Sequence, residues 1–358
     1  MKFRILNTDR QDEWNALIKR LPPAQQDIYF TPQYYRLFET LRAGRAHCFV
    51  FESDQNDLAL YPFLLNSVND LGYDLDALYF DIQGAYGYNG VVSSSMNPSF
   101  INSFHEAFLN YCENENIIAE FTRFCPIKKN HKFSEKYMNC FFDRHTVSVD
   151  LKKDYSLIKR DYQRSTRKQI ARMQRNPEIK IEYTSNCNLS QVEEVYAIYL
   201  ESMERLGAKI DLIFSLDFFR DMLNMESAHL IIFKLRGRSV SFITFLHFAD
   251  KLHGFLGGTL NEFLTLSPFS LLYDEMIRFG TENNAEYLHV GGGTSNKIDD
   301  KLLNYKLHFS QNKNDFYIGK KIHNPVVYEE VIKQWEGKFA TKEQLRDNQL
   351  LKYRNINV

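Results

Sequence analysis

The sequence has no long apolar run and a formal net charge of only −1. No window approaches about 18 uninterrupted apolar residues, and charged residues stand near the N-terminus where a signal peptide needs an apolar stretch. The 44 Lys and Arg nearly balance the 45 Asp and Glu, so the chain has no general attraction to nucleic acid or to an anionic membrane. Secretion and membrane spanning are therefore disfavoured, a cytoplasmic location is expected, and electrostatic recognition must be local.

Several common signatures of chemistry are also missing. The 5 cysteines are widely spaced and odd in number, without a CxxC pair or a histidine at metal-ligand spacing. They are interpreted as reduced thiols, and no metal site is expected. HExxH, GxSxG, Walker and GxGxxG elements do not occur, which excludes the usual signatures of metalloproteases, serine hydrolases and nucleotide hydrolases.

What is present suffices for two hydrophobic cores. The 358 residues are 44% hydrophobic and include 29 Phe and 21 Tyr. Periodicity in the second half predicts, in order, a strand, two helices, three strands, a helix, a strand, a short helix and a strand: 179–183, 190–206, 216–225, 229–235, 239–248, 251–256, 269–280, 287–290, 302–309 and 315–321. The first half shows a similar order in weaker form.

This repetition predicts a structural duplication of the α/β (α+β) class. Each half is expected to form a mixed, largely antiparallel sheet flanked by helices. The predicted segments are an N-terminal domain at 1–150, a C-terminal domain at 151–339 that begins with a basic helix, and a polar tail at 340–358, to which no function is assigned.

The most informative stretch is a glycine-rich loop followed by a short helix. Gly291, Gly292 and Gly293 follow an apolar strand, and such residues permit left-handed backbone or close approach to a ligand. Lys306 lies in the helix after them, between apolar positions that face inward. The loop is a candidate site for an anionic or acyl substrate, and the alternatives are a tight connection and a surface lysine.

Two other segments are candidate binding elements. Residues 159–175 are rich in Lys and Arg, and Arg164, Arg167 and Lys168 lie mostly opposite an apolar stripe. This cationic face is either solvated or binds phosphate, because guanidinium groups match phosphate oxygens. Residues 81–90 combine Tyr86 and Tyr88 with three glycines at a strand end, which indicates either a turn-rich connection or a set of hydroxyl donors for a ligand.

These motifs together resemble one known family over about residues 28–335. The FemAB-type aminoacyl or acyl transferases contain two domains of the GNAT acyltransferase fold, and the pieces of this chain that resemble them are Tyr29–Tyr35, Tyr86–Gly90, Arg164–Ile170, Met203–Gly207, Ser267–Leu272, Gly291–Gly293 and Leu302–Phe309.

The resemblance implies transfer of an acyl or aminoacyl group to an amine, without a metal or a tightly bound cofactor. The acceptor would be a small-molecule or lipid-linked cell-envelope precursor, such as a peptidoglycan peptide or an amino sugar. Lys306 would lie near the reacting carbonyl or phosphate as the catalytic cation, and Arg205 would hold an anionic substrate. The donor would be aminoacyl-tRNA or acyl-CoA. An anionic membrane at the inner face is a candidate peripheral contact, and no stable DNA partner is expected.

Three departures from the family keep alternatives open. Thr265–Pro268 stands where GNAT enzymes carry a pyrophosphate loop, which argues against conventional acetyl-CoA binding. The coiled-coil arm of some bridge-forming members is missing, and His289 replaces an acid, so no general base is assigned. The alternatives are an acyl-CoA-dependent sugar N-acyltransferase of polysaccharide or lipopolysaccharide synthesis, and a non-catalytic protein that binds a precursor.

Overall fold

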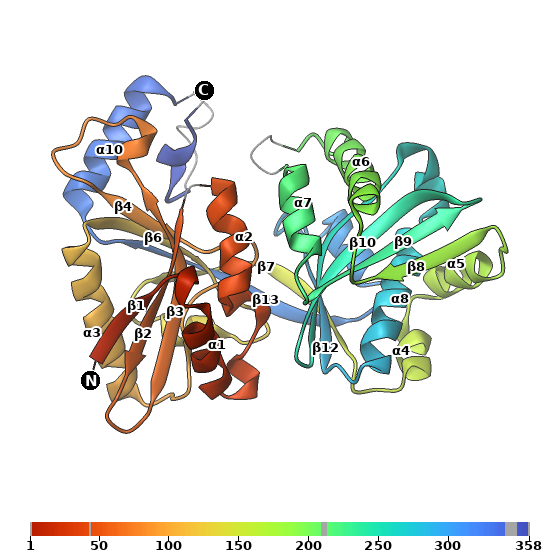
Figure 1. The fold of residues 1–358 in the computed structure, drawn as a ribbon, viewed down its shortest axis with the longest axis horizontal. Coiled ribbons are helices and arrows are strands. Elements are labelled where there is room, and N and C mark those ends of the chain that lie inside the picture. The colour runs from red at the N-terminus through yellow and green to blue at the C-terminus, as the bar shows by residue number, and fades with distance from the viewer. Residues whose placement is uncertain (1, 43, 209–212, 341–348, 357–358) are drawn as a thin grey trace. The chain divides into compact units, whose positions relative to one another are not determined.

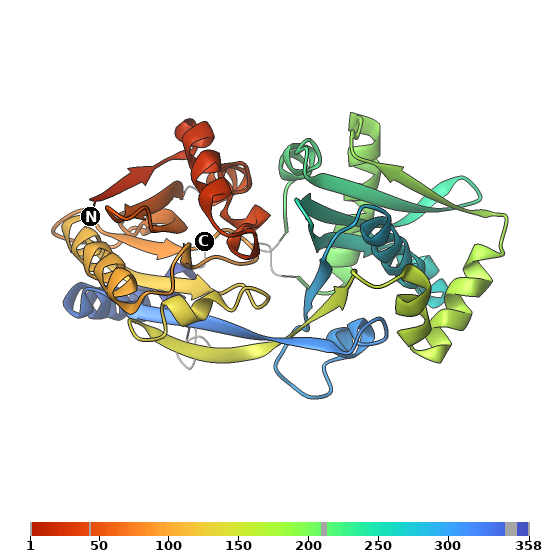
Figure 2. The same ribbon diagram turned by 90° about the horizontal axis from the view of Figure 1, so that it is seen from below.

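The computed structural model describes residues 2–42, 44–208, 213–340 and 349–356. The chain divides into two compact units (Figures 1 and 2). Unit 1 comprises Met1–Asp143 and Phe316–Val358, and unit 2 comprises Arg144–Asp315. Each unit is a mixed, mostly antiparallel sheet with helices on its faces, as the sequence predicts.

Unit 1 is built from the outer parts of the chain. Its elements are β1 (Lys2–Leu6), α1 (Gln11–Arg20), α2 (Pro32–Arg42), β2 (Arg45–Glu52), β3 (Leu58–Ser67), β4 (Phe80–Gln83), β5 (Val92–Ser93), α3 (Pro98–Asn114), β6 (Ile117–Arg123), the first part of β7 (Asn139–Asp150), most of β13 (Asn312–Ile322) and α10 (Pro325–Lys338). The strand order is β1-β2-β3-β4-β6-β13, with β5 beside β3.

The strands of unit 1 alternate their side chains between two helical layers. Tyr61 and Phe63 of β3 pack in one aromatic cluster with Phe104 and Phe108 of α3. On the other face, the Tyr35 hydroxyl of α2 donates to the Pro62 carbonyl at 2.8 Å. Figure 2 shows α1 and α2 on the face of the sheet opposite α3. This alternation follows from the two-residue period of a strand.

Unit 2 is continuous in sequence. It contains the end of β7 and the start of β13, and between them α4 (Tyr155–Asp161), α5 (Arg164–Gln174), β8 (Ile179–Thr184), α6 (Leu189–Arg205), α7 (Leu216–Leu223), β9 (Ala228–Leu235), β10 (Arg238–Phe248), β11 (Lys251–Thr259), α8 (Phe269–Glu282), β12 (Tyr287–Gly292) and α9 (Lys301–Lys306). The strand order is β7-β12-β11-β10-β9-β8.

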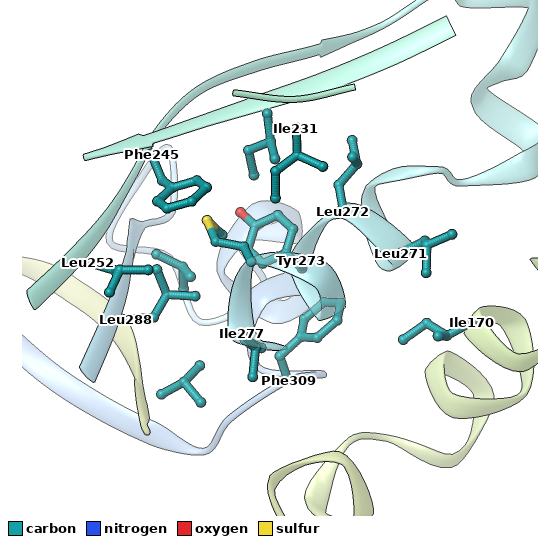
Figure 3. Packing of buried hydrophobic residues seen from close by; sticks show 14 of the residues in the cluster. Ile170, Ile231, Phe245, Leu252, Leu271, Leu272, Tyr273, Ile277, Leu288 and Phe309 are labelled. Carbon is teal, nitrogen blue, oxygen red and sulfur yellow. The ribbon is translucent and has the colours of Figure 1, made fainter. Parts of the chain in front are cut away.

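Helix α8 lies against the centre of the sheet of unit 2. Its residues at helical spacing, including Leu272, Tyr273 and Ile277, are buried against Phe245 and Leu288 of the sheet (Figure 3). The predicted apolar face of this helix is confirmed. Burial of each such side chain contributes about 1.5–3 kcal/mol of hydrophobic free energy, so this interface positions the strand ends beside α8.

The strand that pairs with β6 comes from much later in the chain. β6 pairs antiparallel with β13, which is formed from residues some 200 positions later, although β7 follows β6 in the chain. β7 in turn pairs antiparallel with β12. The compact units therefore differ from the consecutive segments 1–150, 151–339 and 340–358, because pairing between strands distant in sequence brings residues 316–358 to unit 1.

The described part of the predicted tail is held by unit 1. Tyr353 is fully buried, and its hydroxyl donates to the buried Asp81 carboxylate at 2.7 Å. Arg354 donates to the same carboxylate at 2.7 Å. The Trp335 indole of α10 donates to the Asn355 carbonyl at 3.1 Å. Residues 341–348, 357 and 358 of the predicted tail lie outside the described residues.

Candidate active site

Strands β11 and β12 of unit 2 pair over a short stretch only. They run parallel, with Lys251, Leu252 and His253 paired to Tyr287, Leu288 and His289. β11 continues to Thr259 along β10, but it makes no further ladder pairs with β12 in the described structure. Backbone groups on the β12 side of β11 therefore lie outside the ladder, and the three glycines follow at the end of β12.

The glycines belong partly to the strand and partly to the loop. β12 extends through Gly292, two residues beyond the predicted end at Val290. The register against β7 shifts between His289 and Gly291, and Gly291 has a φ of +74°. This is a β-bulge, in which glycine accepts a left-handed conformation at little cost.

Gly292 and Gly293 allow close approach of other groups. A Cβ atom at Gly292 would lie 3.0 Å from the His145 carbonyl oxygen, and one at Gly293 would lie 2.3 Å from a carboxylate oxygen of Asp300. The Arg144 guanidinium donates to the Gly293 carbonyl at 3.1 Å. A distinct steric or conformational constraint therefore favours glycine at each of the three positions.

Lys306 is buried, and it lies on the glycine segment. Its side chain is 7% exposed, and its Nζ donates to the Gly292 carbonyl at 2.7 Å. Burial lowers the pKa of the Lys306 ammonium to about 8, and the negative charge of Asp300 opposes that shift. The geometry is that of a fixed cation at a strand end, and it excludes the alternative of a surface lysine.

Asp300 was not identified from the sequence. It caps α9 by accepting from the Leu303 N–H at 2.8 Å, and it also accepts from Thr294 and Ser295. Burial raises the pKa of the Asp300 carboxyl, but these hydrogen bonds outweigh burial and hold that pKa well below its ordinary value. The available signal was an Asp two residues before the predicted short helix of residues 302–309, close to where an N-cap is expected.

The basic helix α5 begins beside the segment that carries Lys306. The Gln163 N–H donates to the His308 carbonyl at 2.8 Å, and the Thr166 hydroxyl lies 3.4 Å from Nδ1 of His308. Farther along α5, Gln169 hydrogen bonds to Ser270 at the start of α8 at 3.0 Å, and the Ser270 hydroxyl lies 3.2 Å from the Tyr305 hydroxyl. Helices α5, α8 and α9 are therefore linked by side-chain hydrogen bonds.

The predicted anion-binding residues of α5 have different surroundings. Arg164 and Lys168 are exposed, and the described residues offer neither of them an ion pair. Arg167 is half-buried and donates to the Tyr162 carbonyl at 2.7 Å, so part of its hydrogen-bonding capacity joins α4 to α5. Arg164 and Lys168 are one helical turn apart and lie on the same face.

Arg205 lies at the end of α6. It is exposed, and its guanidinium donates to the Thr259 carbonyl at 2.9 Å, where β11 ends. It also donates to the Asn261 side chain at 2.5 Å. Among the residues that the structure describes, no hydrogen bond or ion pair joins Arg205 to Lys306.

Tyr86 and Tyr88 belong to unit 1. Tyr86 is 41% exposed, and its carbonyl accepts from the Tyr34 hydroxyl. Tyr88 is buried, with its ring 5.2 Å from Tyr29 and 5.5 Å from Phe316, both in edge-to-face geometry. Of the predicted site residues, the structure thus gathers the three glycines and Lys306 in unit 2, next to the start of the basic helix.

No helix in the described part of the chain is both long enough and apolar enough to cross a bilayer.

Comparisons with known proteins agree with this architecture. Residues 160–307, which lie within unit 2, match the family model of the acetyltransferase (GNAT) domain. The fold is similar to the crystal structure of FemX, with a TM-score of 0.68 and 12% sequence identity over 92% of this chain and 99% of that chain. No curated protein sequence matches the chain.

Two further solved structures share the two-unit architecture. L-PGS from Bacillus licheniformis has a TM-score of 0.58 and 12% identity, covering 91% of this chain and 96% of that chain. A tandem GNAT protein from the clavulanic acid biosynthesis pathway has a TM-score of 0.53 and 7% identity, covering 90% of this chain and 99% of that chain. The resemblance to FemAB-type proteins is therefore confirmed at the level of the fold: the chain has the tandem GNAT fold, and its second unit carries the sequence pattern of a GNAT domain.

Proposed function

We propose that the protein transfers an acyl or aminoacyl group to an amino group of a cell-envelope precursor, with Lys306 as the catalytic cation. The observation that carries this proposal is the buried Lys306 ammonium on the Gly292 carbonyl, at the end of a parallel strand pair whose ladder stops early. The envelope-related acceptor comes from the FemAB-type resemblance, and the fold shared with FemX and L-PGS supports that resemblance.

The proposed reaction is attack of an amine on an activated carbonyl. The amine nitrogen forms a bond to the carbonyl carbon and loses one proton to water or to a substrate phosphate. The bond to the carrier oxygen or sulfur breaks, and that atom takes up one proton and leaves as the free hydroxyl or thiol of the carrier. Negative charge develops on the carbonyl oxygen, and a fixed cation stabilises that charge. The Lys306 ammonium has three N–H bonds, of which the described structure occupies one, at Gly292.

The start of α8 argues against acyl-CoA as the donor. In a conventional site, free N–H groups at this helix end would bind a pyrophosphate. Here Pro268 has no N–H, the Ser270 N–H donates to the Ser267 carbonyl at 3.1 Å, and the Leu271 N–H donates to the Pro268 carbonyl at 3.0 Å. These groups are already satisfied within the turn, so an aminoacyl-tRNA donor is favoured.

The cationic face of α5 supports a polyanionic carrier. Arg164, Lys168 and Arg172 are exposed at intervals of four residues, so they form one row along the helix. The described structure gives none of the three an acidic partner. Such a row would contact successive phosphates of a nucleic-acid backbone, and its apolar opposite side is buried in unit 2 and unavailable for insertion into lipid.

The donor is tested by thermal unfolding of the purified protein with acyl-CoAs, aminoacylated tRNA and deacylated tRNA, at low and high salt, followed by mass spectrometry of amine acceptors. A melting temperature raised by the aminoacylated tRNA, with formation of an amide product, supports the proposal. A shift with acyl-CoA alone transfers the assignment to a CoA-dependent N-acyltransferase. Precursor binding without product from either donor contradicts an enzymatic role.

The cationic row predicts a salt dependence. Replacing Arg164, Lys168 and Arg172 together by Gln removes three phosphate contacts, so the slope of log affinity against log salt for tRNA falls in magnitude by about 2 to 3. Fluorescence anisotropy at several salt concentrations measures this slope. The matched control replaces three exposed lysines of unit 1, Lys132, Lys333 and Lys338, and leaves the slope unchanged. Equal slopes in all three proteins would exclude α5 as the contact.

A further inference from the structure

Asp300 organises the loop between β12 and α9. It is 5% exposed, and its carboxylate accepts five hydrogen bonds. The donors are the Leu303 N–H at 2.8 Å, the Thr294 N–H and hydroxyl at 2.9 and 2.7 Å, and the Ser295 N–H and hydroxyl at 2.8 and 3.0 Å. An N-cap usually bonds one or two backbone groups of its helix, so this set exceeds what capping requires.

The same carboxylate explains the third glycine. A side chain at Gly293 would place its Cβ 2.3 Å from one carboxylate oxygen and 2.6 Å from the carboxylate carbon of Asp300. The carboxylate therefore rests directly on the backbone of the glycine segment. Gly291 allows the positive φ of the bulge, whereas Gly293 leaves room for the Asp300 carboxylate.

Two closures hold the segment from Gly292 to Lys306. The Asp300 carboxylate joins the start of the loop to α9 by accepting from the Thr294 and Leu303 N–H groups. The Lys306 Nζ joins the end of α9 to the end of β12 by donating to the Gly292 carbonyl at 2.7 Å. The two charges act on each other, because the negative charge of Asp300 raises the pKa that burial of Lys306 lowers. Loss of the Asp300 charge should therefore lower the pKa of Lys306.

We infer that Asp300 is a positioning residue for the proposed transfer: its carboxylate fixes the glycine segment around the Lys306 ammonium and adds a negative charge to the loop on which that ammonium rests. This inference rests on the proposed role of Lys306. A cap with a purely structural role would stabilise α9 without influencing the protonation of Lys306, which makes the two roles separable.

The test uses the full chain labelled with [15N]lysine, with the Lys306 side-chain resonance assigned by its loss in Lys306→Arg. In Asp300→Asn the pKa of Lys306 is expected to fall by roughly one unit, because an opposite charge has been removed. Ser215→Ala removes the N-cap of α7 in the same unit and controls for lost stability. It is expected to leave the pKa of Lys306 unchanged.

Asp300→Ser retains a good capping group without the charge, and it supplies the same measurement if Asp300→Asn does not fold. An unchanged or raised pKa of Lys306 in a folded uncharged variant overturns the inference. The resonance is observed without substrate, so this outcome is independent of whether the protein proves to be a transferase.

Activity provides a second readout if transfer is established. Asp300→Asn is expected to lose turnover about fivefold at pH 8, where its Lys306 is largely neutral and the wild-type Lys306 is about half protonated, and much less at pH 6, where Lys306 is protonated in both proteins. A loss that is equal at both pH values would indicate a structural role only and contradict the inference.

Discussion

Both units contain a parallel strand pair joined by a helix, but the pair is sealed in unit 1 and open in unit 2. β4 pairs with β6 along its whole length, and a bridge between Asn89 and Phe124 continues the pairing beyond it. In unit 2 the pairing of β11 with β12 stops at His253 and His289. In unit 1 the loop after β4 returns to the sheet through Asn89. In unit 2 the described structure has no ladder pair between β11 and β12 beyond His253 and His289, so these strand ends stay open.

Asn89 seals the pair in unit 1. It is fully buried, its N–H donates to the Arg123 carbonyl at 2.7 Å, and its side-chain oxygen accepts from the Arg123 N–H at 2.8 Å. A side chain at Gly84 would place its Cβ 2.4 Å from Asn89. The tyrosine-containing loop of residues 84–90 thus continues the β4–β6 pairing in unit 1, and the GNAT family model matches residues within unit 2.

The largest expected difference between the units concerns chemistry. Lys306→Met removes the buried cation of unit 2 and is expected to lower turnover about 10²- to 10³-fold, as the loss of one oxyanion-stabilising group does. Rates are measured with the donor and acceptor identified by product analysis. Lys301→Met changes an exposed lysine of the same helix and serves as the control. Full activity in Lys306→Met would contradict the catalytic role.

The next comparison concerns pH and stability. The pKa of Lys306 is about 8 in the folded chain, below its ordinary value of 10.5, so the unfolded chain binds more protons between these values. The free energy of unfolding should rise with pH from about 8 to 10.5, by about 3 kcal/mol more in the wild type than in Lys306→Met. Urea unfolding at pH 7 and pH 10 measures it. Parallel pH profiles would show that Lys306 is not desolvated.

Asn89→Ala should change the stability of unit 1 without changing the reaction in unit 2. It removes the acceptor of the Arg123 N–H and is expected to lower the stability of unit 1 by about 1–3 kcal/mol. Turnover per folded molecule should stay unchanged, because the glycine segment of unit 2 is untouched. Denaturant unfolding and rate measurements on one sample test both statements. A large loss of turnover at full folding would give the sealed pair a role in the reaction.

The smallest effect is expected at the bulge. Gly291→Ala places a side chain at a φ of +74°, with its Cβ 3.4 Å from the Lys306 Nζ. Gly237→Ala meets a similar φ of +81° with nothing within 4 Å. Both should lose about 1–2 kcal/mol of stability from backbone strain. Only Gly291→Ala should also lower turnover, and equal turnover in the two variants would show that the bulge does not position Lys306.

Local patterns predicted most of the helices and strands, because periodicity and turn residues act over short distances. The apolar face of α8 is an example. The sequence also placed the three glycines beside Lys306 correctly. It did not reveal that β12 continues through Gly292, because the bulge depends on pairing with β7, more than 100 residues earlier.

Pairing and side-chain networks account for what sequence reasoning missed. In the sequence Asn89 is an ordinary turn residue, because its pairing with Arg123 and Phe124 forms only when β6 lies beside it. Asp300 precedes a short helix, as many N-caps do, and its additional bonds to Thr294 and Ser295 require the folded loop. That β13 rather than β7 lies beside β6 has no local signal in the sequence, because it depends on pairing between strands far apart in the chain.

The late position of β13 in the chain imposes an order on folding during synthesis. When β6 leaves the ribosome, the strand that will cover its edge has not yet been made, because β13 ends about 200 residues later. At 5–20 residues per second, that edge waits roughly 10–40 s. An uncovered edge is a template for pairing with other chains. Folding of unit 1 is therefore complete only after β13 has been synthesised. A chain truncated before residue 312 would leave the edge of β6 uncovered and prone to aggregation.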